Sequence, residues 1–146
     1  MPPSEIGNTH AAPIRPANPL DAPALAQIRL LLHREVATPT DEMAGDFLDR
    51  CGQTYARLIA DGSYRAWIAA GTDGAIVGTA SVFVREMLPR LDTRETREAR
   101  IQSVYVVPVY RSAGLGRRLM HEALAWIREA GISRVVLHPS RRARSL

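Results

Sequence analysis

The sequence contains no lysine, because all 19 basic residues among its 146 positions are arginines. A Walker-type phosphate loop, a Schiff base and a lysine general base each require a side-chain amine, so the sequence excludes these three chemistries. A single cysteine, Cys51, excludes an internal disulfide and a cysteine-rich zinc site, and is typical of a reducing compartment. We interpret Cys51 as a packing residue and expect no metal site.

Long apolar runs are also missing. No segment approaches the roughly 18 apolar residues of a membrane span, and the opening MPPSEIGNTHAAP lacks the apolar centre of a secretory signal. We therefore expect a cytoplasmic protein with no membrane partner, and the arginine-rich, alanine-rich composition favours a bacterial source. The net charge of +4 favours anionic partners. Nucleic acid is disfavoured, because aromatics are only 5% and the basic residues are scattered among 15 acidic ones.

Length and periodicity predict one domain with a mixed α/β (α+β) fold. The chain is long enough for one core and too short for two ordinary domains. Residues 1–12 are proline-rich and aperiodic, which predicts a disordered tail before a domain at 13–146. The expected elements are an edge strand at 12–17, helices at 21–36 and 38–61, strands at 64–70 and 75–84, a charged connection at 86–100, a strand at 101–107, a helix at 116–130 and a strand at 133–138. This β-α-α-β-β-β-α-β order predicts a sheet with helices against it.

Apolar stripes predict which helix residues face the core. They are Leu25, Ile28, Leu32 and Val36, then Met43, Phe47, Cys51, Tyr55, Leu58 and Ile59, and finally Leu119, Ala123, Trp126 and Ile127. On the strand at 101–107, side chains alternate between the two faces. We therefore expect Tyr105 to point opposite to Val104 and Val106, into the core or against a helix.

The junction YVVPVYRSAGLGRRL, residues 105–119, predicts an anion site. A helix N-terminus leaves backbone N–H groups unsatisfied and carries about half a positive charge. Arg117 and Arg118 oppose that dipole by roughly 0.3–1 kcal/mol each unless an anion is bound, so the pattern favours a pyrophosphate. A dinucleotide fingerprint is excluded, because Leu119 stands where the third glycine belongs and no carboxylate ends the next strand.

The same residues resemble motif A of the GCN5-related N-acetyltransferase (GNAT) superfamily. That motif reads Arg or Gln, two residues, Gly, one residue, then Gly or Ala, and Arg111, Gly114 and Gly116 match it. It follows a hydrophobic strand through the run Val106-Val107-Pro108-Val109-Tyr110 and opens an amphipathic helix. The resemblance covers roughly residues 12–140 and implies a GNAT-like, mostly antiparallel mixed sheet flanked by helices.

The resemblance also implies a function. It implies an N-acetyltransferase that moves an acetyl group from acetyl-CoA to a primary amine of a small molecule or peptide by direct attack. The pyrophosphate would lie on the glycine-containing loop, the pantetheine arm along the preceding strand, and the Val106 amide would polarise the thioester carbonyl. The implied cofactor-binding residues are Val104, Val106, Arg111, Ser112, Ala113, Gly114, Leu115, Gly116 and Arg117.

The sequence departs from the family pattern at the position of the catalytic general base. Many members carry a glutamate where this chain has Gln102, which cannot usefully accept a proton. Glu98 is our candidate catalytic base, and Glu86, His138 and a water chain stay open as alternatives. The arginines of the connection indicate either a carboxylated acceptor or a solvated loop.

The second departure concerns the end of the sequence. The segment from Ser140 to Leu146 is typical of the first turns of a helix, and the tyrosine and final strands of the family do not follow. We therefore expect a C-terminally incomplete domain. Two alternatives stay open, a non-catalytic acetyl-CoA-binding module and an inactive truncated acetyltransferase, with a basic nucleic-acid-binding domain as a remote third. A homodimer and the identity of the amine acceptor also stay open.

Overall fold

The structure, a computed structural model, describes residues 12–137. Its elements are β1 (Ile14–Pro16), the 3-10 helix η2 (Pro19–Asp21), α2 (Ala22–Arg34), α3 (Asp41–Asp61), β2 (Tyr64–Ala70), β3 (Ile76–Glu86), β4 (Arg97–Val106), the 3-10 helix η3 (Pro108–Tyr110), α4 (Leu115–Glu129) and β5 (Arg134–Leu137). This order confirms the predicted β-α-α-β-β-β-α-β succession. Apart from Ala12, the expected tail lies outside the described residues, and so does the segment from residue 138 onward.

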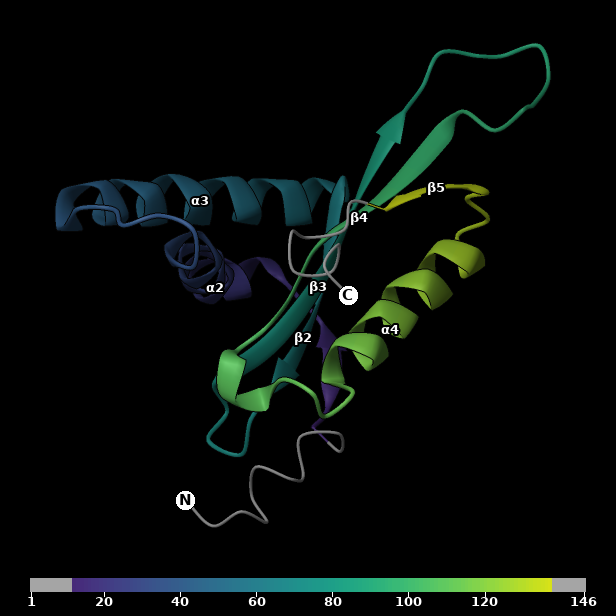
Figure 1. Cartoon of the computed structure of the whole chain (residues 1–146). Coiled ribbons are helices and arrows are strands. Elements are labelled where there is room, and N and C mark those ends of the chain that lie inside the picture. The colour runs from purple at the N-terminus through teal and green to yellow at the C-terminus, as the bar shows by residue number, and fades with distance from the viewer. Residues whose placement is uncertain (1–11, 138–146) are drawn as a thin grey trace.

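The strands form one sheet in the order β1-β2-β3-β4-β5. The first three pairings are antiparallel and β4 pairs with β5 in parallel. Helices α2 and α3 cover one face of the sheet and α4 covers the other (Figure 1). The mixed, mostly antiparallel sheet flanked by helices is therefore confirmed. None of the helices in the described part of the chain is both long and apolar enough to cross a membrane.

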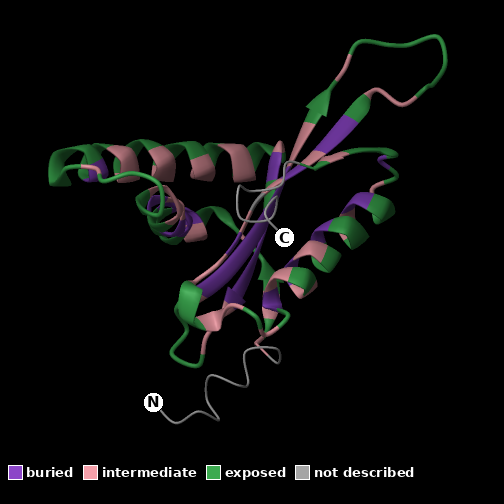
Figure 2. Ribbon diagram, in the orientation of Figure 1, coloured by how far each residue is buried: buried purple, intermediate pink, exposed green. Residues whose placement is uncertain are grey.

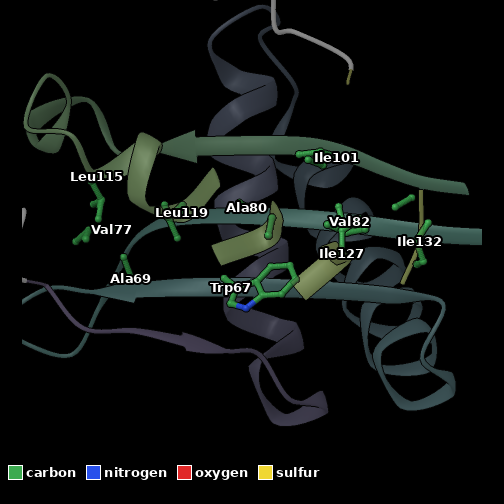
Figure 3. Packing of buried hydrophobic residues seen from close by; sticks show 12 residues of the cluster. Trp67, Ala69, Val77, Ala80, Val82, Ile101, Leu115, Leu119, Ile127 and Ile132 are labelled. Atoms are coloured by element: carbon green, nitrogen blue, oxygen red, sulfur yellow. The ribbon is translucent and has the colours of Figure 1, made fainter. Parts of the chain in front are cut away.

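The larger core lies between α4 and the sheet (Figure 3). Its buried residues include Trp67, Val77, Val82, Ile101, Leu115, Leu119 and Ile127. Gly78 of β3 lets the helix approach closely, because a Cβ built there would lie 3.0 Å from Leu119 Cδ1 and 3.3 Å from Leu115 Cδ2. A residue without a side chain at this position thus lets Leu115 and Leu119 of α4 pack directly on β3.

The second core lies under α2 and α3. Leu25 of α2 packs there with Tyr64, Ala66 and Ile68, which are alternate residues of β2. Because side chains alternate across a strand, the intervening Trp67 belongs to the core on the α4 side. The central strands are accordingly buried on both faces (Figure 2).

Several predicted boundaries and core positions were wrong. Helix α2 ends at Arg34, so Val36 is 73% exposed instead of buried. Helix α3 begins at Asp41, because Thr40 Oγ1 accepts the Met43 N–H and caps the helix there, and Met43 is 61% exposed. Strand β4 begins at residue 97, inside the segment predicted as a charged connection. The charged residues join the strand because opposite charges face each other across the β3–β4 ladder.

Candidate functional site

The junction between β4 and α4 turns through two residues with positive φ. Ser112 has φ 69° and Gly114, the N-cap residue of α4, has φ 82°. Glycine adopts this conformation without penalty, whereas a serine there is strained. Such strain in a non-glycine residue is common at ligand-binding loops. The turn brings the start of the helix against the end of the strand, and a Cβ built on Gly116 would lie 3.7 Å from Val106 Cγ2.

The N-terminus of α4 has no side-chain cap. Gly114 offers no side-chain acceptor, and the first turn contains no acidic residue. By contrast, α3 begins with a Thr40 cap followed by Asp41 and Glu42. Gly114 thus leaves the first amides of α4 without a cap from its side chain, and this helix N-terminus has the features that the sequence pattern predicts for an anion site.

Arg111 fixes the loop in front of this helix. Its Nε donates to the Val106 carbonyl at 2.7 Å, its Nη2 donates to Glu35 at 2.7 Å, and its guanidinium lies 5.2 Å from the centre of the Tyr105 ring. Its backbone N–H donates to the Pro108 carbonyl at 3.1 Å. Because the Arg111 amide already donates within the loop, it is not free to bind an anion. The amides predicted to bind an anion are therefore those of residues 112–116. The contact with Glu35 was not predicted, because nothing in the sequence connects two residues so far apart.

The backbone of β4 faces an unpaired edge beside the loop. Val107 donates its N–H to Val77 of β3 at 2.9 Å. Backbone groups alternate in direction along a strand, so the N–H of Val106 points away from β3. Strand β5 pairs with β4 only from Glu98 to Ile101. Within residues 12–137, the Val106 amide thus faces an edge that no strand covers.

Side-chain directions on β4 agree with the predicted alternation. The register with β3 shifts by one residue between Thr79 and Ser81, which gives β4 an extra residue just before this edge. Beyond the shift, Val104 and Val106 pack against the core on the α4 side. Tyr105 is 6% exposed and lines a narrow space beside α2 on the opposite face. The prediction for Tyr105 is confirmed.

Glu98, the predicted base, lies in a cluster of arginines. Its carboxylate is 1% exposed and contacts Arg134 Nε at 2.9 Å, Arg85 Nε at 2.9 Å and Arg100 Nη2 at 3.5 Å. The hydrogen bond from Arg134, together with that from Arg85, holds the pKa of Glu98 below its ordinary value. A buried carboxylate stabilised in its charged form is a weak base. The base role stays a prediction that this geometry disfavours.

The other candidate bases have less support. Glu86 ends β3, is exposed and lies opposite Arg97 in the ladder. His138 lies outside the described residues. Gln102 accepts a hydrogen bond from Ser81 Oγ on its backbone carbonyl at 2.7 Å. The described residues therefore place no carboxylate at the position where the family pattern has one.

The arginines of the predicted charged connection are largely engaged by the protein. Arg85 contacts Glu98, Arg90 forms two hydrogen bonds of 3.0 Å with Asp92, and Arg97 donates to the Ala130 carbonyl at 3.1 Å. Of the two interpretations of these arginines, a structural and solvated loop fits the structure better than a carboxylate-binding one.

Comparison with known proteins points to one family. Residues 29–146 match the sequence model of the Acetyltransferase (GNAT) family. The aminoglycoside N(6')-acetyltransferase type 1 of Stenotrophomonas maltophilia is 31% identical over 121 residues, which cover 83% of this chain and 71% of that protein. A GCN5-related N-acetyltransferase from Ralstonia eutropha JMP134 is 27% identical with a TM-score of 0.76, over 91% of this chain and 86% of that one. A predicted acetyltransferase with acetyl-CoA from Clostridium acetobutylicum has the same fold, with a TM-score of 0.77 at 20% identity, over 91% and 84% of the two chains.

Proposed function

The chain belongs to the Acetyltransferase (GNAT) family, and on that premise we propose that it transfers an acetyl group from acetyl-CoA to a primary amine of a small molecule or peptide. The observation that carries the proposal is the uncapped N-terminus of α4 lying directly beside the unpaired edge of β4. The helix N-terminus suits a diphosphate, and the strand edge suits an extended arm that contains amides. A Cβ built on Gly116 would lie 3.7 Å from Val106 Cγ2, so the helix N-terminus and the strand edge are close enough for one ligand to use both.

Each predicted binding residue has a role in this proposal. The amides of residues 112–116 bind the pyrophosphate, and Arg117 adds positive charge in the first turn of α4. Arg111 acts through its side chain, by holding the loop against Val106 and Glu35. Val104 and Val106 bind the pantetheine arm by adding it to the edge of the sheet.

The chemistry proposed is direct transfer. The neutral amine of the acceptor attacks the thioester carbonyl carbon, the C–S bond breaks, and the products are an N-acetyl amide and a thiol. The Val106 N–H donates to the carbonyl oxygen as negative charge develops on it. The proton lost by the amine is finally taken up by the thiolate or by solvent. The residue that relays it is unassigned, because Glu98 is held by arginines and Gln102 cannot accept it.

The non-catalytic acetyl-CoA-binding module remains a second candidate. The observation that favours it is that no base is assigned, since a site that binds the thioester without activating an amine would be a sensor.

The choice of test acceptors follows from the relatives. The relative from Stenotrophomonas maltophilia is named as an aminoglycoside N(6')-acetyltransferase, so an aminoglycoside is one acceptor to test, alongside amino acids and a peptide N-terminus.

Two measurements test the proposal. Calorimetric titration with acetyl-CoA is expected to show binding, and thiol release with a panel of amines is expected to exceed release with acetyl-CoA alone. Binding without amine-dependent release would favour the sensor. No binding of acetyl-CoA, together with binding of nucleic acid, would overturn the proposal in favour of the remote third alternative.

A further inference from the structure

Glu35 lies where its own helix does not favour a carboxylate. It is the C-cap residue of α2, with its backbone N–H bonded to the Leu32 carbonyl at 3.3 Å. The C-terminal end of a helix carries partial negative charge, so a cation suits this position better than an anion. The carboxylate bonds instead to Arg111 Nη2 at 2.7 Å, across 76 positions of the sequence. Its partner in the fold thus belongs to the loop in front of α4.

Arg111 is held from three directions. Its Nη2 donates to Glu35 and its Nε donates to the Val106 carbonyl, each at 2.7 Å. Its guanidinium also lies 5.2 Å from the centre of the Tyr105 ring. The donors of a guanidinium form a rigid planar fork, so bonds from two of its nitrogens fix its orientation as well as its place. Removal of one partner therefore loosens the hold of Arg111 on the others.

The Val106 carbonyl that Arg111 binds points to the open edge of β4. The Val107 N–H donates to Val77 of β3 at 2.9 Å. In a trans peptide the C=O and the following N–H point in opposite directions, so the Val106 carbonyl points away from β3. Arg111 Nε thus reaches the edge along which we propose that the pantetheine arm lies.

The residue after Arg111 needs support from its surroundings. Ser112 has φ 69°, a conformation that a residue with a side chain keeps only where neighbouring contacts hold it. Leu115, which is 1% exposed, holds the loop on the side of α4. On the other side the loop is held by Arg111, through its side chain and through its backbone bond to Pro108. The shape of the loop at residues 112–116 thus depends on how firmly Arg111 is held.

The turn after Glu35 is joined to β4 by the same contact. The amides of Val36 and Ala37 both donate to the His33 carbonyl, at 3.1 and 2.9 Å. Val36 is 73% exposed, so its side chain contributes little packing that would hold this turn. The bond between Glu35 and Arg111 connects the turn to the end of the strand.

We propose that Glu35 is a positioning residue for acetyl-CoA: its carboxylate holds Arg111 against Val106, and Arg111 in turn fixes the loop at residues 112–116. The ligand touches the loop and the edge of β4, and it does not touch Glu35. Because coupling between two sites is reciprocal, acetyl-CoA bound to the loop also stabilises the turn at residues 36–37. This inference rests on the proposed function and adds to it a residue of α2 that lies outside the glycine-containing motif.

The sign of one change in affinity tests the proposal. Glu35→Gln keeps the size of the side chain and removes its charge. Positioning predicts a rise of about two- to fivefold in the Kd for acetyl-CoA, the range expected for a partly exposed ion pair. Charge alone predicts the opposite, since removing a negative charge near the site should tighten the binding of a diphosphate. Glu129→Gln, exposed at the C-terminal end of α4, is the matched control and should leave the Kd unchanged.

A second background tests whether Glu35 acts through Arg111. Arg111→Lys keeps the positive charge but lacks the fork that bonds two partners. If the effect passes through Arg111, Glu35→Gln should change the Kd much less in this background than in the wild type. An equal change in both backgrounds would overturn the proposal, because Glu35 would then act independently of Arg111.

Kinetics separate positioning from contact with the amine. Glu35→Gln should raise the KM for acetyl-CoA and leave kcat and the KM for the amine unchanged. A change in the KM for the amine alone would overturn the proposal, since Glu35 would then serve the acceptor.

Hydrogen exchange provides a readout that does not depend on turnover. Acetyl-CoA should slow exchange of the Val36 and Ala37 amides in the wild type and in Glu129→Gln, and not in Glu35→Gln. Equal protection in all three proteins, or unchanged or tighter binding by Glu35→Gln, would overturn the inference while the wild type still binds acetyl-CoA. A wild type that does not bind acetyl-CoA would instead overturn the proposed function, and this inference with it.

Discussion

At the scale of single residues, the proposed binding loop combines a side chain that bonds to the protein with backbone amides that we propose to bind the ligand. Arg111 is the clearest case, because its guanidinium bonds to Val106 and Glu35 and its backbone N–H bonds to Pro108. The motif identified the residue, but its partners come from distant parts of the chain. Gly116, in contrast, is proposed to contribute only its backbone amide, and a Cβ built on it would lie 3.7 Å from Val106 Cγ2.

Gly116→Asp separates helix stability from ligand binding. A carboxylate in the first turn of a helix interacts favourably with the macrodipole by about 0.3–1 kcal/mol, so the variant should unfold at an equal or higher temperature. The same charge would repel the diphosphate, and the Kd for acetyl-CoA should rise by tenfold or more, a change of about 1.4 kcal/mol. Thermal unfolding and calorimetry measure the two effects.

Gly116→Asn is the control, since it has nearly the same size and no charge. It should weaken acetyl-CoA much less than the aspartate does. Equal losses for the two variants would mean that size and not charge is responsible, and the diphosphate assignment of the helix N-terminus would be wrong.

At the scale of elements, α4 is positioned by close packing on β3. Gly78→Ala would place a Cβ 3.0 Å from Leu119 Cδ1 and 3.4 Å from the Tyr105 carbonyl oxygen. Leu119 and Leu115, whose methyl groups would lie 3.0 and 3.3 Å from the new Cβ, are fully buried and must move by a few tenths of an ångström, so we expect a loss of about 1–3 kcal/mol in the free energy of unfolding. Gly45→Ala is the matched control, as nothing lies within 4 Å of its Cβ. It should gain up to about 1 kcal/mol from helix propensity in α3. Urea denaturation compares both, and a neutral Gly78→Ala would contradict the close contact.

The three strands β3, β4 and β5 are joined at one end by Glu98. Arg85 of β3 and Arg134 of β5 both bond to its carboxylate, which was predicted as a base in a surface connection. Glu98→Gln should lower the unfolding temperature by a few degrees, because the partly exposed guanidinium groups of Arg85 and Arg134 lose the negative charge that they share. If Glu98 is structural, the folded variant should keep its kcat for amine-dependent thiol release. A normal stability with a collapsed kcat would restore the base role.

The acid dependence of stability follows from the same cluster. The folded pKa of Glu98 lies below its ordinary value of 4.5, so the unfolded chain binds the proton more tightly. The stability due to the ionised carboxylate is fully present above about pH 4.5 and is lost as pH falls through the folded pKa. Urea midpoints of the wild type and Glu98→Gln should therefore converge below that pH. A constant difference down to the lowest pH at which both fold would contradict the ion cluster.

At the scale of the whole molecule, the sequence predicted the order of elements and the position of the junction between β4 and α4. Periodicity and the glycine-containing junction are local signals, and they located α4 and β2 to within a residue, whereas the ligand-binding role of the junction stays a prediction. Features that join residues distant along the chain were not predicted. They are the ion cluster around Glu98, the contact between Arg111 and Glu35, and a cavity lined by residues of α2, α3, β2 and β3. Val36 and Met43 were placed in the core because the apolar stripe continues past the end of α2 and into the first turn of α3.

The overall positive charge should make acetyl-CoA binding depend on salt. With a net charge of +4 and arginines in the first turn of α4, the protein attracts the anionic nucleotide part of the ligand. Raising ionic strength from about 0.01 M to about 1 M shortens the Debye length from about 30 Å to about 3 Å, and the Kd should rise steadily across that range. S-acetylpantetheine, which lacks the nucleotide and pyrophosphate, is the control and should bind weakly with little salt dependence. If both ligands respond equally to salt, the charge at the helix N-terminus does not bind the diphosphate, and the edge of β4 alone would account for the affinity.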